Sequence, residues 1–102
     1  MINNTRTVIT YLKTELKYLA VGDVLDHSSM HGQCYETIRR IEPMWMGTRS
    51  ALLEDQHGGL RAVTLTSVGM HTVVSGEKLT AARQNPALVK TSPSGHPVWK
   101  GG

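Results

Sequence analysis

Residues 48–66 have the sequence TRSALLEDQHGGLRAVTLT, which contains the clearest pair of strand patterns in the chain. Two runs rich in apolar and β-branched residues, 48–54 and 60–66, flank a short polar segment that ends in Gly58-Gly59. Glycine readily adopts the positive φ that tight hairpin connections require. The stretch therefore predicts two antiparallel strands joined by a turn.

Short apolar runs separated by turn residues continue on both sides of this hairpin. Pro43 ends the run before it, because proline has no N–H to donate to a strand ladder. Ser67-Val68-Gly69 predicts a tight turn after it. Counting outward, the sequence predicts five strands, over residues 21–26, 34–41, 48–54, 60–66 and 70–74.

The two flanks of this central region have different patterns. Apolar residues recur at helical spacing near the N-terminus, at Val8, Leu12, Leu16 and Leu19. This spacing predicts a helix over residues 5–20, and the β-branched residues at its start leave a strand over 7–12 as the alternative. Downstream, residues 77–84 predict two helical turns, and 91–97 show no periodicity, which predicts an extended or mobile tail.

Length and composition restrict the class of protein. The 102 residues suit one domain, and the 39% apolar content supports a globular core of aliphatic side chains, since aromatic residues make up 5% and Phe is absent. No apolar run approaches the ~18 residues of a membrane span. The single cysteine, Cys34, excludes an internal disulfide and a four-cysteine zinc site, so we expect a reducing, cytoplasmic compartment.

The order of features over residues 21–74 resembles an SH3-like small β-barrel, the architecture shared by tudor and KOW modules. The segments that carry the likeness are Val21-Gly22-Asp23-Val24, Tyr35–Ile41, Ala51–Asp55, Ala62–Leu65, Ser67-Val68-Gly69 and His71–Val74. The resemblance implies a module that binds peptides, nucleic acids or a protein surface. It departs from the tudor pattern, because only Tyr35 and Trp45 are available for an aromatic cage.

Together these patterns predict an α+β fold. We expect an N-terminal helix packed on a five-stranded antiparallel SH3-like β-barrel within residues 1–76, followed over 77–102 by a short helix and a flexible basic tail. The expected core residues are Val24, Ile38, Leu53, Val63, Leu65 and Val73.

The net charge of +3 is unevenly distributed. Residues 1–20 carry +2 and residues 75–102 carry +3, whereas residues 21–74 carry −2. A nucleic-acid-binding module that uses these basic flanks is the alternative function. In the tail its electrostatic contacts would come from Lys78, Arg83, Lys90 and Lys100.

Arginines of the central region are further candidates for partner contacts. Side chains alternate along a strand, so the pair Arg39-Arg40 predicts one guanidinium on each face of the sheet. Arg39, Arg49 and Arg61 have the geometry to contact phosphate or another protein. The competing interpretation is a surface arginine together with one packed against a carboxylate such as Glu54.

Chemistry at a catalytic or metal site is not predicted. His27, His31 and Cys34 have zinc-compatible side chains at a spacing of His-x3-His-x2-Cys, but the flanking serines and Gly32 favour an ordinary loop, and a fourth ligand is not specified. Nucleophile-elbow and phosphate-loop motifs are missing from the sequence. We therefore expect no metal, no cofactor and no enzymatic activity.

Met44-Trp45-Met46 is the segment most indicative of a partner. Three large apolar side chains in a row on a loop cannot all point inward, and Met and Trp are enriched at protein interfaces. The alternative is a lid that closes one end of the barrel. The sequence thus predicts a non-catalytic protein-binding module, and its small size and minimal architecture suggest an inhibitor or accessory factor of a virus or mobile element.

Overall fold

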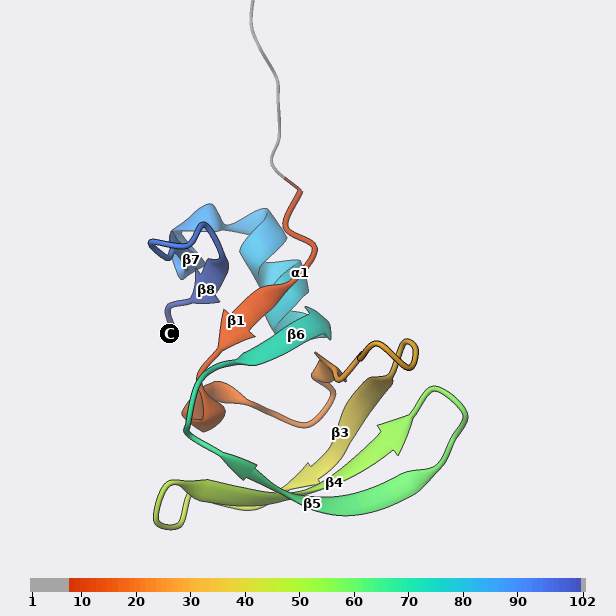
Figure 1. Cartoon of the computed structure of the whole chain (residues 1–102). Coiled ribbons are helices and arrows are strands. Elements are labelled where there is room, and N and C mark those ends of the chain that lie inside the picture. Colours follow the sequence, from red (N-terminus) through yellow and green to blue (C-terminus); the bar gives the residue numbers. More distant parts are fainter. Residues whose placement is uncertain (1–7, 102) are drawn as a thin grey trace, which may run out of the picture.

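A computed structural model describes residues 8–101 and shows one mixed sheet of eight strands, in the spatial order β5-β4-β3-β2-β6-β1-β8-β7 (Figure 1). The strands are β1 (Leu12–Thr14), β2 (Val24–Asp26), β3 (Tyr35–Ile41), β4 (Thr48–Asp55), β5 (Leu60–Thr66), β6 (His71–Ser75), β7 (Val89–Thr91) and β8 (Pro97–Trp99). The helical elements are α1 (Glu77–Gln84) and the 3₁₀ helices η1 (Leu16–Tyr18) and η2 (Pro86–Leu88). All strand pairs are antiparallel except β1 with β8.

The β4–β5 hairpin that the opening stretch predicts is confirmed. Its register pairs Thr48 with Thr66 through to Glu54 with Leu60, without a shift. In the turn, the carboxylate of Asp55 accepts hydrogen bonds from the N–H groups of His57 and Gly59, and Gly58 has a φ of 85°. Asp55 thus supplies acceptors for two backbone N–H groups of the turn, and Gly58 adopts the positive φ that the turn requires.

The predicted N-terminal helix is wrong over the described residues. The chain forms β1 and η1 instead, and residues 5–7 of the prediction lie outside the described part. Leu12, Thr14 and Leu16 are buried whereas the residues between them are half-buried, so the real period is two. β1 pairs with β6 on one side and with β8 on the other. These tertiary backbone hydrogen bonds favour a strand over the helix that the local spacing predicts.

The prediction of a five-stranded barrel with a basic tail is also wrong. The sheet has edges at β5 and β7 and is not closed into a barrel. The helix over 77–84 is confirmed as α1, but the chain then forms η2, β7 and β8. Val98 and Trp99 are buried, so the end of the described chain is part of the fold and not a flexible tail.

Two apolar clusters hold the molecule together. The first fills the curved inner face of the sheet and consists of Leu16, Leu19, Leu25, Ile38, Ala51, Leu53, Leu65 and Val73. The second joins α1 and β8 to β1 through Leu12, Leu79, Ala82 and Trp99. Four expected core residues are buried as predicted, namely Ile38, Leu53, Leu65 and Val73. Val24 and Val63 are half-buried, Val63 because it lies on the edge strand β5.

A bulge in β3 corrects the prediction for Arg39 and Arg40. The β3–β4 register shifts between Ile38 and Arg40, so Arg39 is an extra residue in the strand. Ile38 and Ile41 both pack on the first cluster, and the two arginines between them are exposed. In a regular strand only one residue would separate two side chains on the same face, so the bulge accounts for the second. The arginines therefore do not project one to each face.

No helix within residues 8–101 is long and apolar enough to cross a lipid bilayer.

Candidate protein-binding surface

The β3–β4 connection is a tight turn that presents Trp45 and Met46 to solvent. The Trp45 N–H donates to the carbonyl of Thr48 at 2.9 Å, and the Thr48 N–H donates back to Trp45 at 3.0 Å. Met46 and Gly47 between them have φ values of 50° and 75°. Positive φ at both central residues is the hallmark of the type I′ hairpin turn, whose twist matches that of the strands.

Met46 is the one non-glycine residue with positive φ among those that the structure describes. A side chain in this left-handed region costs about 1–2 kcal/mol, and Asn or Gly normally occupies the position. Backbone strain of this kind clusters at functional sites, where it is retained because it presents a particular side chain. Here the strained residue is an exposed methionine beside an exposed tryptophan.

The side chains of this turn are open to solvent. Trp45 is 72% exposed and Met46 is 82% exposed, and Met44 is also exposed. The loop therefore does not close over the sheet as a lid, which was the alternative interpretation of its sequence. Large apolar side chains that cluster on a surface mark binding sites more often than single exposed ones do.

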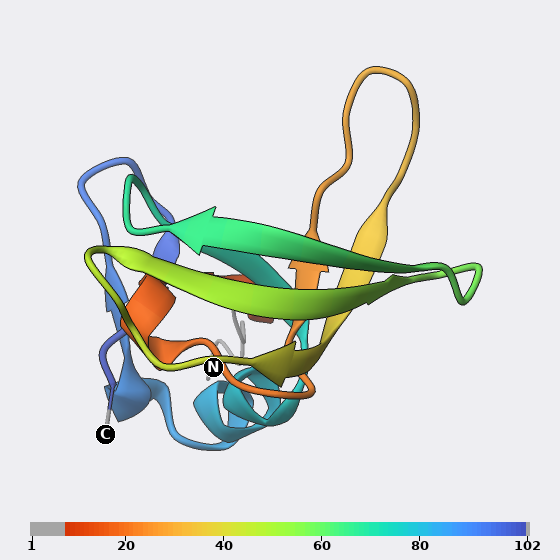
Figure 2. The same ribbon diagram turned by 90° about the horizontal axis from the view of Figure 1, so that it is seen from below.

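A second loop lies beside the first and adds two apolar residues. The Ser67 N–H donates to the carbonyl of Gly47 at 2.9 Å, which holds the 67–70 loop next to the β3–β4 turn. Figure 2 shows both loops at the same end of the sheet, away from the 55–59 turn. Val68 is 89% exposed, and Met70 is also exposed. We call the resulting group the Trp45 surface; it consists of Met44, Trp45, Met46, Val68 and Met70.

A shallow pocket lies at the rim of the Trp45 surface. Its volume is about 320 Å³, and its lining includes Met44, Met70 and the buried Leu16. Glu15 and Lys17 also line it and form an ion pair with an N–O distance of 3.4 Å. The hydrogen bond with Glu15 raises the pKa of Lys17. The two residues form a pair of opposite charges at the rim.

Arg49 fixes the position of the surface from beneath. Its Nε donates to the carbonyl of Glu42 at 2.8 Å. Its Nη1 donates to the carbonyls of Leu16 and Leu19 at 3.0 and 2.9 Å. One guanidinium thus ties the start of the turn to the segment around η1. Arg49, which the sequence predicts as a partner contact, thus holds the backbone on both sides of this surface in place.

The other two candidate arginines are engaged in separate ion pairs. Arg39 Nε donates to Glu54 at 2.5 Å, as in the interpretation that packs one arginine against this carboxylate. Arg61 forms two hydrogen bonds with the buried Glu36, both at 2.6 Å, and the Nδ1 of His27 lies 2.5 Å from the same carboxylate. Arg61 lowers the pKa of Glu36 to about 2, with a smaller contribution from His27, although burial opposes the shift.

The basic residues after residue 75 differ in their contacts with the rest of the fold. Lys78 pairs with the buried Asp23 at 2.7 Å, and its own side chain is 12% exposed. Arg83 Nε donates to the carbonyl of Ile9 at 2.9 Å. Lys90 and Lys100 are exposed. Two of the four side chains predicted to provide tail electrostatics are thus committed to contacts within the fold.

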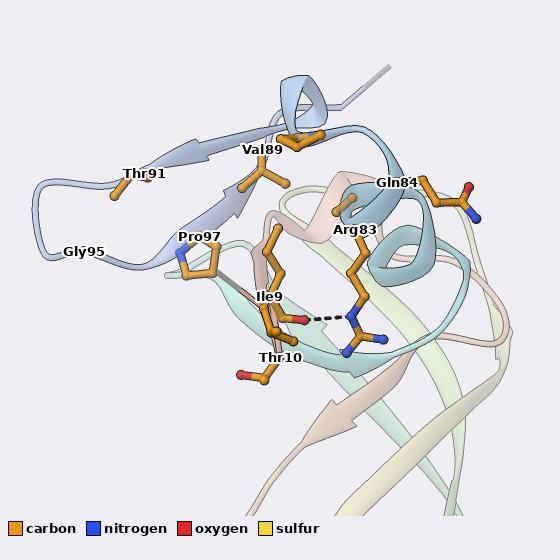
Figure 3. A pocket seen from close by; sticks show the side chains of 11 residues that line it. Ile9, Thr10, Arg83, Gln84, Val89, Thr91, Gly95 and Pro97 are labelled. Carbon is orange, nitrogen blue, oxygen red and sulfur yellow. Dashed lines mark hydrogen bonds between the residues drawn. The ribbon is translucent and has the colours of Figure 1, made fainter. Parts of the chain in front are cut away.

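Arg83 also lines a wide groove beside α1. Figure 3 shows Ile9, Arg83, Val89 and Pro97 around this groove, whose volume is about 1040 Å³. Arg83 is its one charged lining residue and is hydrogen-bonded to Ile9, which also lines the groove. Apolar and backbone groups make up most of the wall, so the groove offers no pair of groups for acid–base or nucleophilic chemistry.

His27, His31 and Cys34 lie in the loop between β2 and β3. His27 is held by Glu36, His31 is exposed and Cys34 is half-buried. Across residues 8–101, no three His, Cys, Asp or Glu side chains gather in a way that would hold a metal ion.

Sequence reasoning identified Met44, Trp45 and Met46 but missed Val68 and Met70. Val68 stands between Ser67 and Gly69, where the sequence predicts a tight turn, and Met70 stands at the start of the last predicted strand. The signal that could have found them is a bulky apolar residue inside a turn, where nothing nearby can bury it.

Comparisons with protein-family models, with curated proteins and with solved structures gave no match.

Proposed function

We propose that this chain is a non-catalytic protein-binding module that contacts its partner through the Trp45 surface. The observation that carries the proposal is the strained, braced turn that holds Trp45 and Met46 in solvent beside Val68. Tryptophan is among the commonest interface hot spots, and methionine adapts to irregular apolar pockets. The expected partner is therefore a protein with an apolar pocket that receives the Trp45 ring.

The ordered position of the surface supports binding without a large entropic cost. The type I′ turn, the Arg49 contacts and the hydrogen bond between the two loops fix the backbone before a partner arrives. Preorganised loops lose less conformational freedom on binding than flexible ones. Because Glu15 and Lys17 neutralise each other at the rim, we expect partner binding to depend weakly on salt.

The same contacts weigh against the nucleic-acid alternative. Phosphate contacts need free basic side chains in one groove or stripe. Lys78 and Arg83 are bound to groups of the fold, and Arg39 and Arg61 are paired with carboxylates. A nucleic-acid partner is an outcome that the experiment below separates from a protein partner.

Capture of partners from a native lysate by the immobilised full chain tests the proposal. Trp45→Ala should weaken capture about 30-fold, which corresponds to a hot spot of ~2 kcal/mol. Met30→Ala is the matched control, because Met30 is 93% exposed and lies in the loop between β2 and β3. Equal capture by both variants would contradict the proposal, and capture that a nuclease abolishes would favour the nucleic-acid alternative.

A further inference from the structure

The edge strand β5 presents backbone groups, at Ala62 and Thr64, that no other strand within residues 8–101 pairs with. Asp55 N–H donates to Gly59, and Ser67 N–H donates to Gly47, which fixes the phase of the β4–β5 ladder. In that register Arg61, Val63 and Leu65 exchange hydrogen bonds with β4. The N–H and C=O groups of Ala62 and Thr64 therefore point away from β4, toward the open side of the sheet.

Within the described residues this side of β5 is open as far as Thr64, whereas the carbonyl of Thr66 lies 2.9 Å from the Nε2 of His71. β5 ends the strand order and forms the lower margin of the sheet in Figure 1. Leu60, Ala62 and Thr64 are all exposed. Their side chains lie on the outer face of the sheet, opposite Val63 and Leu65, which face the first apolar cluster.

The edge lacks the features that normally prevent strands from pairing with other chains. Edges are usually blunted by proline, bulges, short length or projecting charges. β5 is seven residues long and contains no proline, and its register with β4 has no shift. Its one charged residue, Arg61, is drawn to Glu36.

The opposite edge, β7, shows the contrast. It is three residues long, carries the exposed Lys90, and is flanked by Pro86 and Pro93. Those features protect it from pairing. Of the two edges in the described sheet, only β5 is left suited to receive another strand.

We propose that β5 pairs antiparallel with β5 of a second copy of this chain, about a two-fold axis at Val63. In this register Ala62 faces Thr64 of the second copy, and each such pair exchanges both backbone hydrogen bonds. Arg61 then faces Leu65 across the axis, so like charges do not meet. Registers that bring Arg61 opposite itself use fewer residues and oppose two positive charges.

The proposed dimer leaves the Trp45 surface of each copy free to bind a partner. The dimer itself does not depend on the proposed protein-binding function. Thr66, at the end of β5 nearest the Trp45 surface, would lie beside Leu60 of the second copy. The two Trp45 surfaces would stand at opposite ends of one continuous sheet. Both remain open, because the pairing uses the edge and not the loops.

Sedimentation equilibrium of the full chain, from micromolar to near-millimolar concentration, tests the proposal. The wild-type average mass should rise toward twice the monomer mass, with little dependence on salt. Ala62→Lys combined with Thr64→Lys opposes like charges in both pairs and should weaken the dimer about tenfold or more. Ser50→Lys combined with Leu52→Lys adds the same charges to the paired positions of β4 and should leave dimerisation intact.

Amide hydrogen exchange read residue by residue keeps the test independent of the folding of these variants. In the wild type, protection of the Ala62 and Thr64 amides should increase with protein concentration. The amides of Val63 and Leu65, which already bond β4, should be protected at every concentration. A mass that stays monomeric, or exchange at Ala62 and Thr64 that does not change with concentration, would overturn the proposal.

Discussion

Met46→Asn should make the protein more stable and a poorer binder. Met46 has a φ of 50°, where an ordinary side chain costs about 1–2 kcal/mol. Asparagine tolerates this conformation and is preferred before glycine in type I′ turns, and Gly47 follows here. Removing part of the strain should raise the free energy of unfolding by about 0.5–1 kcal/mol. Little packing is lost, since the Met46 side chain is 82% exposed.

Two control variants separate strain from side-chain chemistry. Met46→Ala removes the methionine but keeps a side chain in the left-handed region, so it should not stabilise the fold. Met44→Asn places asparagine at a neighbouring exposed residue without positive φ, so it too should give no gain. Both Met46 variants should weaken partner capture if this side chain is part of the interface.

Urea denaturation followed by circular dichroism measures the stability, and pull-down measures the binding. Stabilisation without loss of capture would show that Met46 is not part of the binding surface. A Met46→Asn protein no more stable than the wild type would refute the strain argument itself. The expected combination is a trade between stability and function, which is common where a strained residue serves binding.

Two further variants test the core and its buried ion pair. Leu53→Ala should lower the free energy of unfolding by about 2–4 kcal/mol, because Leu53 is fully buried. Val63→Ala should lower it by about 1 kcal/mol or less, because Val63 lies half-buried on the edge strand. Equal losses in urea titrations would refute the core assignment. Glu36→Gln should cost about 1–2 kcal/mol at pH 7, less than the full pKa shift implies, because the Arg61 side chain is 57% exposed. The pKa of Glu36 is lowered on folding, so its contribution to stability is present above about pH 4.5 and is lost as the pH falls toward 2. The difference between wild type and Glu36→Gln should shrink over that window, and a difference independent of pH would contradict this role for the ion pair.

The central strands could be predicted because their signals are local. The glycines of the 55–59 turn, Pro43 and the alternating residues of β4 and β5 each act within a few positions of the chain. Local propensity and tertiary pairing agree there, so all five predicted strands are found within a few residues of their expected ends.

The parts that sequence reasoning missed depend on contacts far apart in the chain. Lys13 pairs with Val98, and Leu12 packs with Trp99 in the second cluster. No short-range pattern shows that β8 will lie beside β1, so the local patterns predict a helix at the start and a tail at the end. The open edge at β5 likewise follows from where strand pairing stops, which the residues of β5 alone do not determine.

The candidate site was partly visible for the same reason. Three consecutive large apolar residues at Met44–Met46 indicate a surface role by themselves. Their union with Val68 and Met70 requires the hydrogen bond between Ser67 and Gly47, which joins two loops that are separate in the sequence. The bracing role of Arg49 was equally hidden, because its acceptors are backbone carbonyls that any residue could provide.

Site-specific photo-crosslinking tests most directly whether the Trp45 surface binds a protein. A photoreactive phenylalanine analogue replaces Val68 within the surface or, as control, Met30 in the loop between β2 and β3, and each full-length protein is irradiated in native lysate. Both positions are highly exposed, so differences in crosslinking report where the partner lies. A protein-binding Trp45 surface predicts a discrete protein adduct from position 68 that Trp45→Ala abolishes, and none from position 30. Equal adducts from both positions, or an adduct from position 68 that survives Trp45→Ala, would contradict it.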